Sequence, residues 1–170
     1  RHWVTPRQPA ARTGKKIAVV GSGRIGTLRA SMSARHPSVK FLAVSDKDPT
    51  RADVLKQAVG ADLASGDNQE VIAHPSVTSV FVSTPEHDHL EAVLAAIELG
   101  KPVFLEKPVA LTIEDADKIV EASERTGTEV VVGYSRRHDR RWMLTKEHIA
   151  QGRLGEILGI QSRVYNSRTQ

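Results

Sequence analysis

The chain has 170 residues, enough for one domain with a hydrophobic core, and its apolar (39%) and charged (26%) fractions are ordinary for a soluble globular protein. The net charge is +4, but only 4% of residues are aromatic and no basic helix stands out, so we expect no nucleic-acid partner. No apolar run approaches the ~18 residues of a membrane span, and the absence of cysteine excludes disulfides, thiolate catalysis and Cys-based metal sites. The lack of cysteine is compatible with the cytoplasmic location that we expect.

The first 14 residues contain two prolines and no apolar period, and we interpret residues 1–14 as a flexible leader. Because the sequence does not begin with Met, we expect a fragment, a processed form or a trimmed piece of a longer protein.

A glycine motif, GSGRIG at 21–26, lies between a predicted strand and a predicted helix. This order of strand, Gly-x-Gly-x-x-Gly and helix is what a dinucleotide pyrophosphate site requires. Gly21 allows the tight turn, Gly23 lets the backbone approach the phosphates, and Gly26 lets the helix pack close to the strand. The alternative is a glycine-rich turn that binds no ligand.

Strands and helices alternate through the middle of the chain. In chain order we predict a strand at 16–20, a helix at 23–36, a strand at 39–45, a helix at 48–60, a short helix at 67–73, a strand at 77–83, a helix capped by Thr84 and Pro85 that runs to Gly100, a strand at 102–106, a helix at 112–127 and a strand at 129–134. The strands are continuously apolar, as strands covered on both faces are. We therefore predict a doubly wound parallel α/β sheet, the Rossmann fold, as a dinucleotide-binding domain over residues 15–134.

After residue 134 the pattern changes to a helix at 140–152 and a strand at 156–165. A single strand without a neighbour does not make a domain. We expect residues 135–170 to be a linking helix and the first strand of a truncated second domain of the α+β class.

Asp46 directly follows the second predicted strand, about 20 residues past Gly26. A carboxylate at this point can accept hydrogen bonds from the adenosine ribose hydroxyls and repel a 2′-phosphate, which favours NAD. A solvent-facing turn residue is the alternative, and Lys47 and Arg51 close by leave NADP possible.

Ser83, Thr84 and Pro85 end the central strand, where open α/β sheets bind their ligands, although helix capping alone would also explain them. The next four residues, EHDH at 86–89, resemble a metal cluster. Consecutive side chains at a helix start point in different directions, and no second ligand group has matching spacing, so we expect no metal site.

Glu106-Lys107-Pro108 follows a strand and should face the ligand crevice. Pro108 keeps Lys107 out of helical geometry and allows a cis bond. A lysine near a positive nicotinamide is expected to have a lowered pKa and to hydrogen-bond or shuttle the proton of the reacting hydroxyl. The alternative is a surface Glu–Lys pair before a turn.

Taken together, these motifs resemble the Gfo/Idh/MocA oxidoreductase family, which includes inositol and sugar dehydrogenases. The resemblance rests on GSGRIG at 21–26, Asp46, STPEHDHLEAVLAAIELGKPVFLEKPVA at 83–110, VGYSRRHDRRW at 132–142 and GRLGEI at 152–157. It implies NAD, or else NADP, as the cofactor. It also implies hydride transfer between nicotinamide and a secondary alcohol of a sugar, inositol or related polyol.

The resemblance further implies roles for individual residues. It makes Lys107 the catalytic lysine. The cofactor-binding residues that it implies are Gly21, Gly23, Arg24, Ile25, Gly26, Asp46, Thr84, Pro85, His89, Glu106, Lys107 and Arg137.

Members of the family are longer than this chain. Their second, antiparallel-sheet domain provides the substrate pocket, the remaining catalytic groups and usually the interface of a homo-oligomer. We therefore expect this chain alone to bind the cofactor without turnover. A non-catalytic NAD-binding or sensor module and an S-adenosylmethionine methyltransferase stay open as alternatives, although neither needs the lysine motif.

Overall fold

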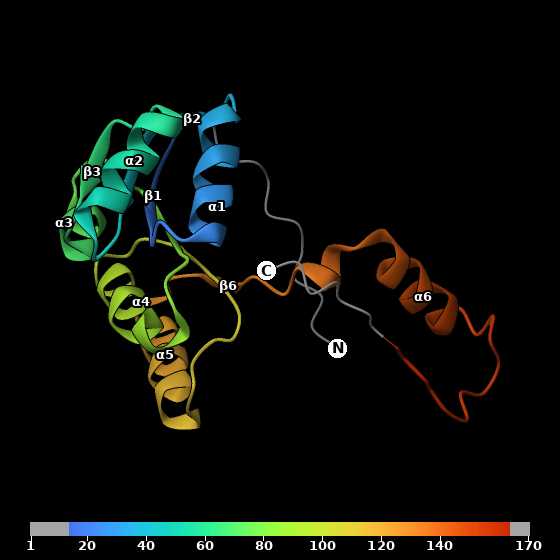
Figure 1. Cartoon of the computed structure of the whole chain (residues 1–170). Helices are drawn as coiled ribbons and strands as arrows, with labels where there is room; N and C mark the ends of the chain where they lie inside the picture. The colour runs from blue at the N-terminus through green and yellow to red at the C-terminus, as the bar shows by residue number, and fades with distance from the viewer. Residues whose placement is uncertain (1–13, 164–170) are drawn as a thin grey trace. The chain divides into compact units, whose positions relative to one another are not determined.

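The computed structural model describes residues 14–163, so the expected leader lies outside the described residues apart from Gly14. The chain divides into two units, one ending at Gly133 and the other beginning at Tyr134 (Figure 1). In residues 14–163, no helix combines the length and the apolar character needed to cross a membrane.

The described part of the first unit, residues 14–133, is built from six strands and five α-helices. Its strands are β1 (Lys15–Val20), β2 (Val39–Ser45), β3 (Leu63–Ser65), β4 (Ser79–Val82), β5 (Val103–Leu105) and β6 (Val130–Val132). Its helices are α1 (Arg24–Arg35), α2 (Pro49–Val59), α3 (Asn68–Ala73), α4 (His89–Glu98) and α5 (Ile113–Thr126), with a 3₁₀ turn η1 (Glu86–Asp88) before α4. All strands are parallel and lie in the order β3-β2-β1-β4-β5-β6, which confirms the predicted doubly wound fold.

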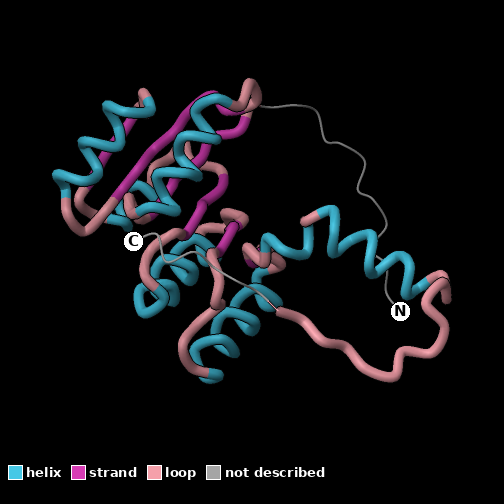
Figure 2. Tube along the Cα trace, turned by 45° about the vertical axis from the view of Figure 1, so that its right-hand side comes forward, coloured by secondary structure: helices cyan, strands magenta, loops and turns pink. Residues whose placement is uncertain are grey.

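Helices cover both faces of the sheet, as Figure 2 shows with strands in magenta and helices in cyan. Alternate residues of β1 pack against helices on opposite faces of the sheet. Ile17 and Val19 belong to a cluster that includes residues of α1 and α2, whereas Ala18 and Val20 belong to a larger cluster with residues of α3, α4 and α5. Because both faces of each central strand are buried, apolar residues run through it without alternation.

Two local predictions in this unit were incomplete or wrong. The strand β3 was missed because it has only three half-buried residues at the sheet edge, too few to form a pattern. Thr84 and Pro85 do not cap α4, because η1 intervenes and α4 begins at His89 without a side-chain cap. By contrast, the helix predicted at 48–60 begins as expected, with Asp48 capping α2 by accepting a hydrogen bond from the Thr50 N–H.

The second unit contains a 3₁₀ turn η2 (Ser135–His138) and the helix α6 (Arg140–Ala150). Asp139 caps α6 by accepting a hydrogen bond from the Arg141 N–H. The strand expected at 156–165 is not formed over residues 156–163, and its last two residues lie outside the described range. A strand needs a hydrogen-bonded neighbour, and the described residues after Tyr134 include no other strand.

Candidate functional site

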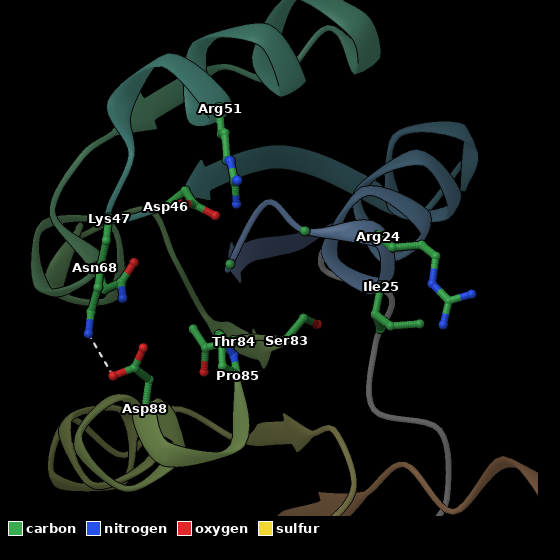
Figure 3. Close-up of a pocket in the computed structure, with 12 residues that line it drawn as sticks. Arg24, Ile25, Asp46, Lys47, Arg51, Asn68, Ser83, Thr84, Pro85 and Asp88 are labelled. Carbon is green, nitrogen blue, oxygen red and sulfur yellow. Dashed lines mark hydrogen bonds and ion pairs between the residues drawn. The ribbon is translucent and has the colours of Figure 1, made fainter. Parts of the chain in front are cut away.

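The turns that follow β1, β2 and β4 meet at one edge of the sheet and line a pocket of about 330 Å³ (Figure 3). The pocket is lined by Gly21, Gly23, Arg24, Ile25, Asp46, Lys47, Arg51, Asn68, Ser83, Thr84, Pro85 and Asp88. The chain winds outward from β1 in one direction through β2 and β3 and in the other through β4 and β5. Open α/β sheets bind ligands at this reversal, outside the carboxyl ends of the strands.

The three motif glycines have different physical reasons for lacking a side chain. Gly21 has a positive φ of 94°, and a Cβ there would lie 2.8 Å from backbone atoms of Ser83 and Thr84. A Cβ on Gly26 would overlap the carbonyl oxygen of Gly21. A Cβ on Gly23, however, would meet no atom within 4 Å. Because Gly23 lines the pocket, its missing side chain leaves space that a bound molecule can fill.

The first turn of α1 opens onto this space through Arg24 and Ile25. Its N-cap is Gly23, which offers no side-chain hydrogen bond, and the first turn contains no acidic residue. The N–H groups at a helix start carry a partial positive charge and bind anions. The end of α1 is therefore suited to a phosphate group.

Asp46 lies on the opposite side of the glycine turn and is fixed by two backbone groups. Its Oδ2 accepts a hydrogen bond of 2.8 Å from the Ser22 N–H, and its Oδ1 accepts one of 3.0 Å from the Asp48 N–H. Each carboxylate oxygen can accept more than one hydrogen bond. The carboxylate is thus oriented at the pocket with acceptor capacity left for a pair of hydroxyls.

Two hydroxyl groups at the end of β4 are buried without a hydrogen-bond partner in the described part of the chain, Ser83 Oγ and Thr84 Oγ1. An unsatisfied buried hydroxyl costs about 1–3 kcal/mol, so such groups in native proteins often mark a ligand or water position. Both residues line the pocket. With the open space at Gly23, the α1 terminus and Asp46, they fit a nucleotide cofactor.

Charged residues form the rim of the pocket on the side of β2. Lys47 Nζ lies 2.6 Å from Asp88 Oδ1, joining the turn after β2 to η1, and this hydrogen bond raises the pKa of Lys47. Arg51 Nε, from the first turn of α2, lies 3.6 Å from Asp48 Oδ2. Beside them, Asn68 accepts a hydrogen bond from Ser45 Oγ through its Oδ1.

The residues after β5 are held by neighbours from other elements. Glu106 Oε1 accepts hydrogen bonds from Arg29 Nε at 2.9 Å and Arg29 Nη2 at 2.5 Å, and the Arg29 guanidinium lies 4.7 Å from the Phe104 ring centre. This pairing ties the segment before Lys107 to α1. Lys107 itself is exposed, and the Lys107–Pro108 peptide bond is cis.

His89, at the start of α4, is only 1% exposed. Its Nδ1 lies 3.0 Å from the Pro108 carbonyl oxygen, and its Nε2 lies 3.1 Å from the Thr84 carbonyl oxygen. The ring therefore links the segment after Lys107 to the segment after β4. Its burial also separates it from Glu86 and His87, and in residues 14–163 no three acidic or histidine side chains converge as a metal site would require.

Residues 15–134 match the model of the Gfo/Idh/MocA oxidoreductase family, described as an oxidoreductase family with an NAD-binding Rossmann fold. The chain belongs to this family. The match confirms the predicted family and the prediction that its Rossmann fold binds NAD.

Similar proteins and solved structures support the family assignment. The chain is 33% identical over 150 residues to the myo-inositol 2-dehydrogenase of Thermotoga maritima, covering 87% of this chain and 45% of that protein. It is 38% identical over 146 residues to inositol 2-dehydrogenase 3 of Saccharopolyspora erythraea, covering 84% and 43%. The scyllo-inositol dehydrogenase of Lactobacillus casei, solved with NAD(H) and scyllo-inositol, superposes with a TM-score of 0.79 at 28% identity, covering 84% and 43%. The chain thus spans less than half the length of these relatives.

The structure brings together seven of the predicted cofactor-binding residues as pocket lining, namely Gly21, Gly23, Arg24, Ile25, Asp46, Thr84 and Pro85. Gly26 instead packs against the Gly21 carbonyl. His89, Glu106 and Lys107 do not line the pocket. Arg137 belongs to the second unit, where its guanidinium lies 5.3 Å from the ring centre of Tyr134. The binding roles of all these residues remain predictions.

Asn68 and Asp88 also line the pocket, and no sequence motif predicts a binding role for either residue. Asn68 begins α3, directly behind the strand β3 that the sequence pattern missed. In the sequence Asp88 belongs to the EHDH run at 86–89, and its pairing with Lys47 joins residues 41 positions apart. Their positions, Asn68 after β3 and Asp88 after β4, are the signal that could have identified them, because ligands bind at the carboxyl ends of the strands.

Proposed function

We propose that this chain is the cofactor-binding part of an NAD-dependent dehydrogenase that acts on a secondary alcohol of inositol, a sugar or a related polyol. The inositol dehydrogenases among its relatives support this class of substrate. When bound, the nicotinamide accepts or donates the hydride, and the protein binds and orients the reactants.

The observation that carries the proposal is the position of Asp46. Its carboxylate is held against the glycine turn by the Ser22 N–H at 2.8 Å, at the end of β2 and facing the pocket. We propose that it accepts hydrogen bonds from both adenosine ribose hydroxyls. The phosphates would then lie at the start of α1, in the space beside Gly23, where backbone N–H groups stabilise negative charge.

We propose Lys107 as the residue that hydrogen-bonds the reacting hydroxyl and transfers its proton. Two contacts support this role by fixing the backbone on either side of it, the Arg29–Glu106 ion pair and the hydrogen bond between His89 and the Pro108 carbonyl. Because the backbone is fixed on both sides, the side-chain nitrogen of Lys107 can reach the substrate hydroxyl at a lower entropic cost than one on an unordered loop. The other groups that the reaction needs are part of the proposal for the whole protein, because this chain spans less than half of its relatives.

Calorimetric titration of this chain with NAD and with NADP tests the cofactor site. We expect NAD to bind and the Asp46→Asn variant to weaken its affinity about 10- to 100-fold, the effect of losing charge-assisted hydrogen bonds of about 1.5–3 kcal/mol. Asp53→Asn is the matched control, since Asp53 is an exposed carboxylate on α2 that does not line the pocket. We expect it to change the affinity less than about twofold.

The same samples, mixed with NAD and myo-inositol, should form no NADH if the chain binds the cofactor without turnover. Equal affinity of the Asp46→Asn and Asp53→Asn variants for NAD, with both folded by thermal unfolding, would show that Asp46 does not hold the ribose. NADH formation by this chain alone would contradict the proposed need for the rest of the protein.

A further inference from the structure

Two cations lie on the pocket rim next to Asp46, and each already faces a carboxylate. Lys47 Nζ is 2.6 Å from Asp88 Oδ1, and Arg51 Nε is 3.6 Å from Asp48 Oδ2. The Lys47 pair is the closer of the two and joins segments 41 residues apart in the chain. Figure 3 shows Lys47 extending toward Asp88 and away from Asp46.

Helix capping does not explain the position of the Asp88 carboxylate. It precedes α4 as the N-cap residue, but it makes no side-chain cap hydrogen bond. Its contacts are Lys47 and, at 3.5 Å through Oδ2, the adjacent His87 ring. Its side chain is only 19% exposed, whereas that of Lys47 is 66% exposed. The carboxylate is therefore the more buried partner of the pair, and the lysine the more exposed one.

We propose that Asp88 is a specificity-determining residue that favours NAD over NADP by engaging Lys47. This inference rests on the proposed function, in which Asp46 holds the adenosine ribose. The two cofactors differ by a phosphate on the ribose 2′-hydroxyl, so a phosphate there would lie among Asp46, Lys47 and Arg51. A protein that accepts this phosphate must provide a cation to offset its charge.

Lys47 is the residue next to Asp46, and its four-carbon side chain would reach the 2′-phosphate if it were released. While Nζ is bonded to Asp88, that cation is neutralised, and the Asp88 carboxylate adds a negative charge to the rim. Both effects act against a dianionic phosphate and have little effect on an uncharged hydroxyl. Removing the Asp88 charge should therefore shift selectivity toward NADP.

Asp88 can be tested more cleanly than Asp48, because Asp48 also caps α2 and its substitution would alter that helix. Glu91 provides a matched control. It lies on α4 and raises the pKa of Lys47 through its charge, but its side chain accepts a hydrogen bond from Gln69 and makes no ion pair with Lys47. Replacing it removes the same charge without releasing the lysine.

The experiment is calorimetric titration with NAD and NADP of the wild-type chain, Asp88→Asn, Glu91→Gln and the double variant Asp88→Asn/Lys47→Met. We expect Asp88→Asn to lower the ratio of the NADP Kd to the NAD Kd about threefold to fivefold, near the upper end of what one exposed charge pair provides. Glu91→Gln should change this ratio less than about twofold. The double variant should lose the gain, because Lys47 is the cation that produces it.

An unchanged ratio in Asp88→Asn would overturn the inference, as would an equal shift in Glu91→Gln or a gain that persists without Lys47. In these cases NAD binding that depends on Asp46 would leave the proposed function intact. Absence of NAD binding by a folded wild-type chain would instead overturn the proposed site. Thermal unfolding checks the folding of each variant, and Asp88→Ala, which also removes the charge, replaces Asp88→Asn if the latter does not fold.

Discussion

The carboxyl ends of β1 and β4 differ from that of β5 in how their polar groups are satisfied. After β1 and β4, the start of α1 has no side-chain cap, and the buried hydroxyls of Ser83 and Thr84 have no hydrogen-bond partner in the described chain. After β5, the Glu106 carboxylate is paired with Arg29, and the neighbouring Pro108 carbonyl faces His89. The first region leaves hydrogen-bonding capacity for a ligand, whereas the second uses that capacity to fix the backbone around Lys107.

The glycine turn after β1 gives the largest test, because Gly23 leaves open space in the pocket whereas Gly26 is needed for packing against Gly21. In Gly26→Ala, the new Cβ would overlap the Gly21 carbonyl oxygen, so we expect the free energy of unfolding to fall by about 3 kcal/mol. In Gly23→Ala, the Cβ enters open space at a φ of −71°, so stability should change by less than about 1 kcal/mol.

For NAD affinity, unlike stability, we expect Gly23→Ala to have a large effect. Folded Gly23→Ala should bind NAD at least about tenfold more weakly, since its methyl group occupies the space proposed for the phosphates. Urea unfolding and calorimetry measure the two quantities. Wild-type affinity in Gly23→Ala would mean that the open space beside Gly23 is not where the cofactor lies.

The ion pair after β5 gives an intermediate effect. Arg29→Met would leave Glu106, whose side chain is 12% exposed, as an unpaired carboxylate, and we expect a loss of about 2 kcal/mol in unfolding free energy. Arg125→Met is the control, because Arg125 and Glu98 also form an ion pair but are 61% and 53% exposed. Its loss should stay below about 1 kcal/mol, since water screens exposed pairs. Equal losses, measured by urea unfolding, would show that Glu106 is not held by Arg29.

Features that depend on neighbouring residues could be predicted from the sequence. The glycine turn, the position of Asp46 at the end of a strand and the alternation of apolar strands with helices are local patterns, and together they defined the fold and much of the pocket. Lys47 and Arg51 could be associated with the site because they follow Asp46 closely in the sequence.

Contacts between distant segments could not be predicted. Arg29 and Glu106 are 77 residues apart, and neither the pattern of α1 nor that of β5 indicates the other as a partner. His89 was predicted to border the cofactor, yet burial and its contacts with two backbone carbonyls depend on how α4 packs beside two loops. The short strand β3 could not be predicted for a different reason: its pairing with β2, rather than its composition, makes it a strand.

Thr84 offers the smallest but most specific test, because its hydroxyl is buried and lacks a partner in the described chain. Thr84→Val replaces that hydroxyl by a methyl group of similar shape, so the free energy of unfolding should stay the same or rise by up to about 1 kcal/mol. NAD affinity should nevertheless fall about threefold to tenfold, if the hydroxyl bonds the cofactor.

Thr112→Val is the matched control, since the Thr112 hydroxyl accepts a hydrogen bond from the Asp115 N–H and caps α5. That variant should lose about 1 kcal/mol of stability and keep its NAD affinity, because Thr112 does not line the pocket. The two valine variants would thus change opposite properties. If Thr84→Val instead lost stability and kept its NAD affinity, as expected for Thr112→Val, the Thr84 hydroxyl would stabilise the fold rather than bind the cofactor. The contrast with the carboxyl end of β5 would then hold for β1 but not for β4.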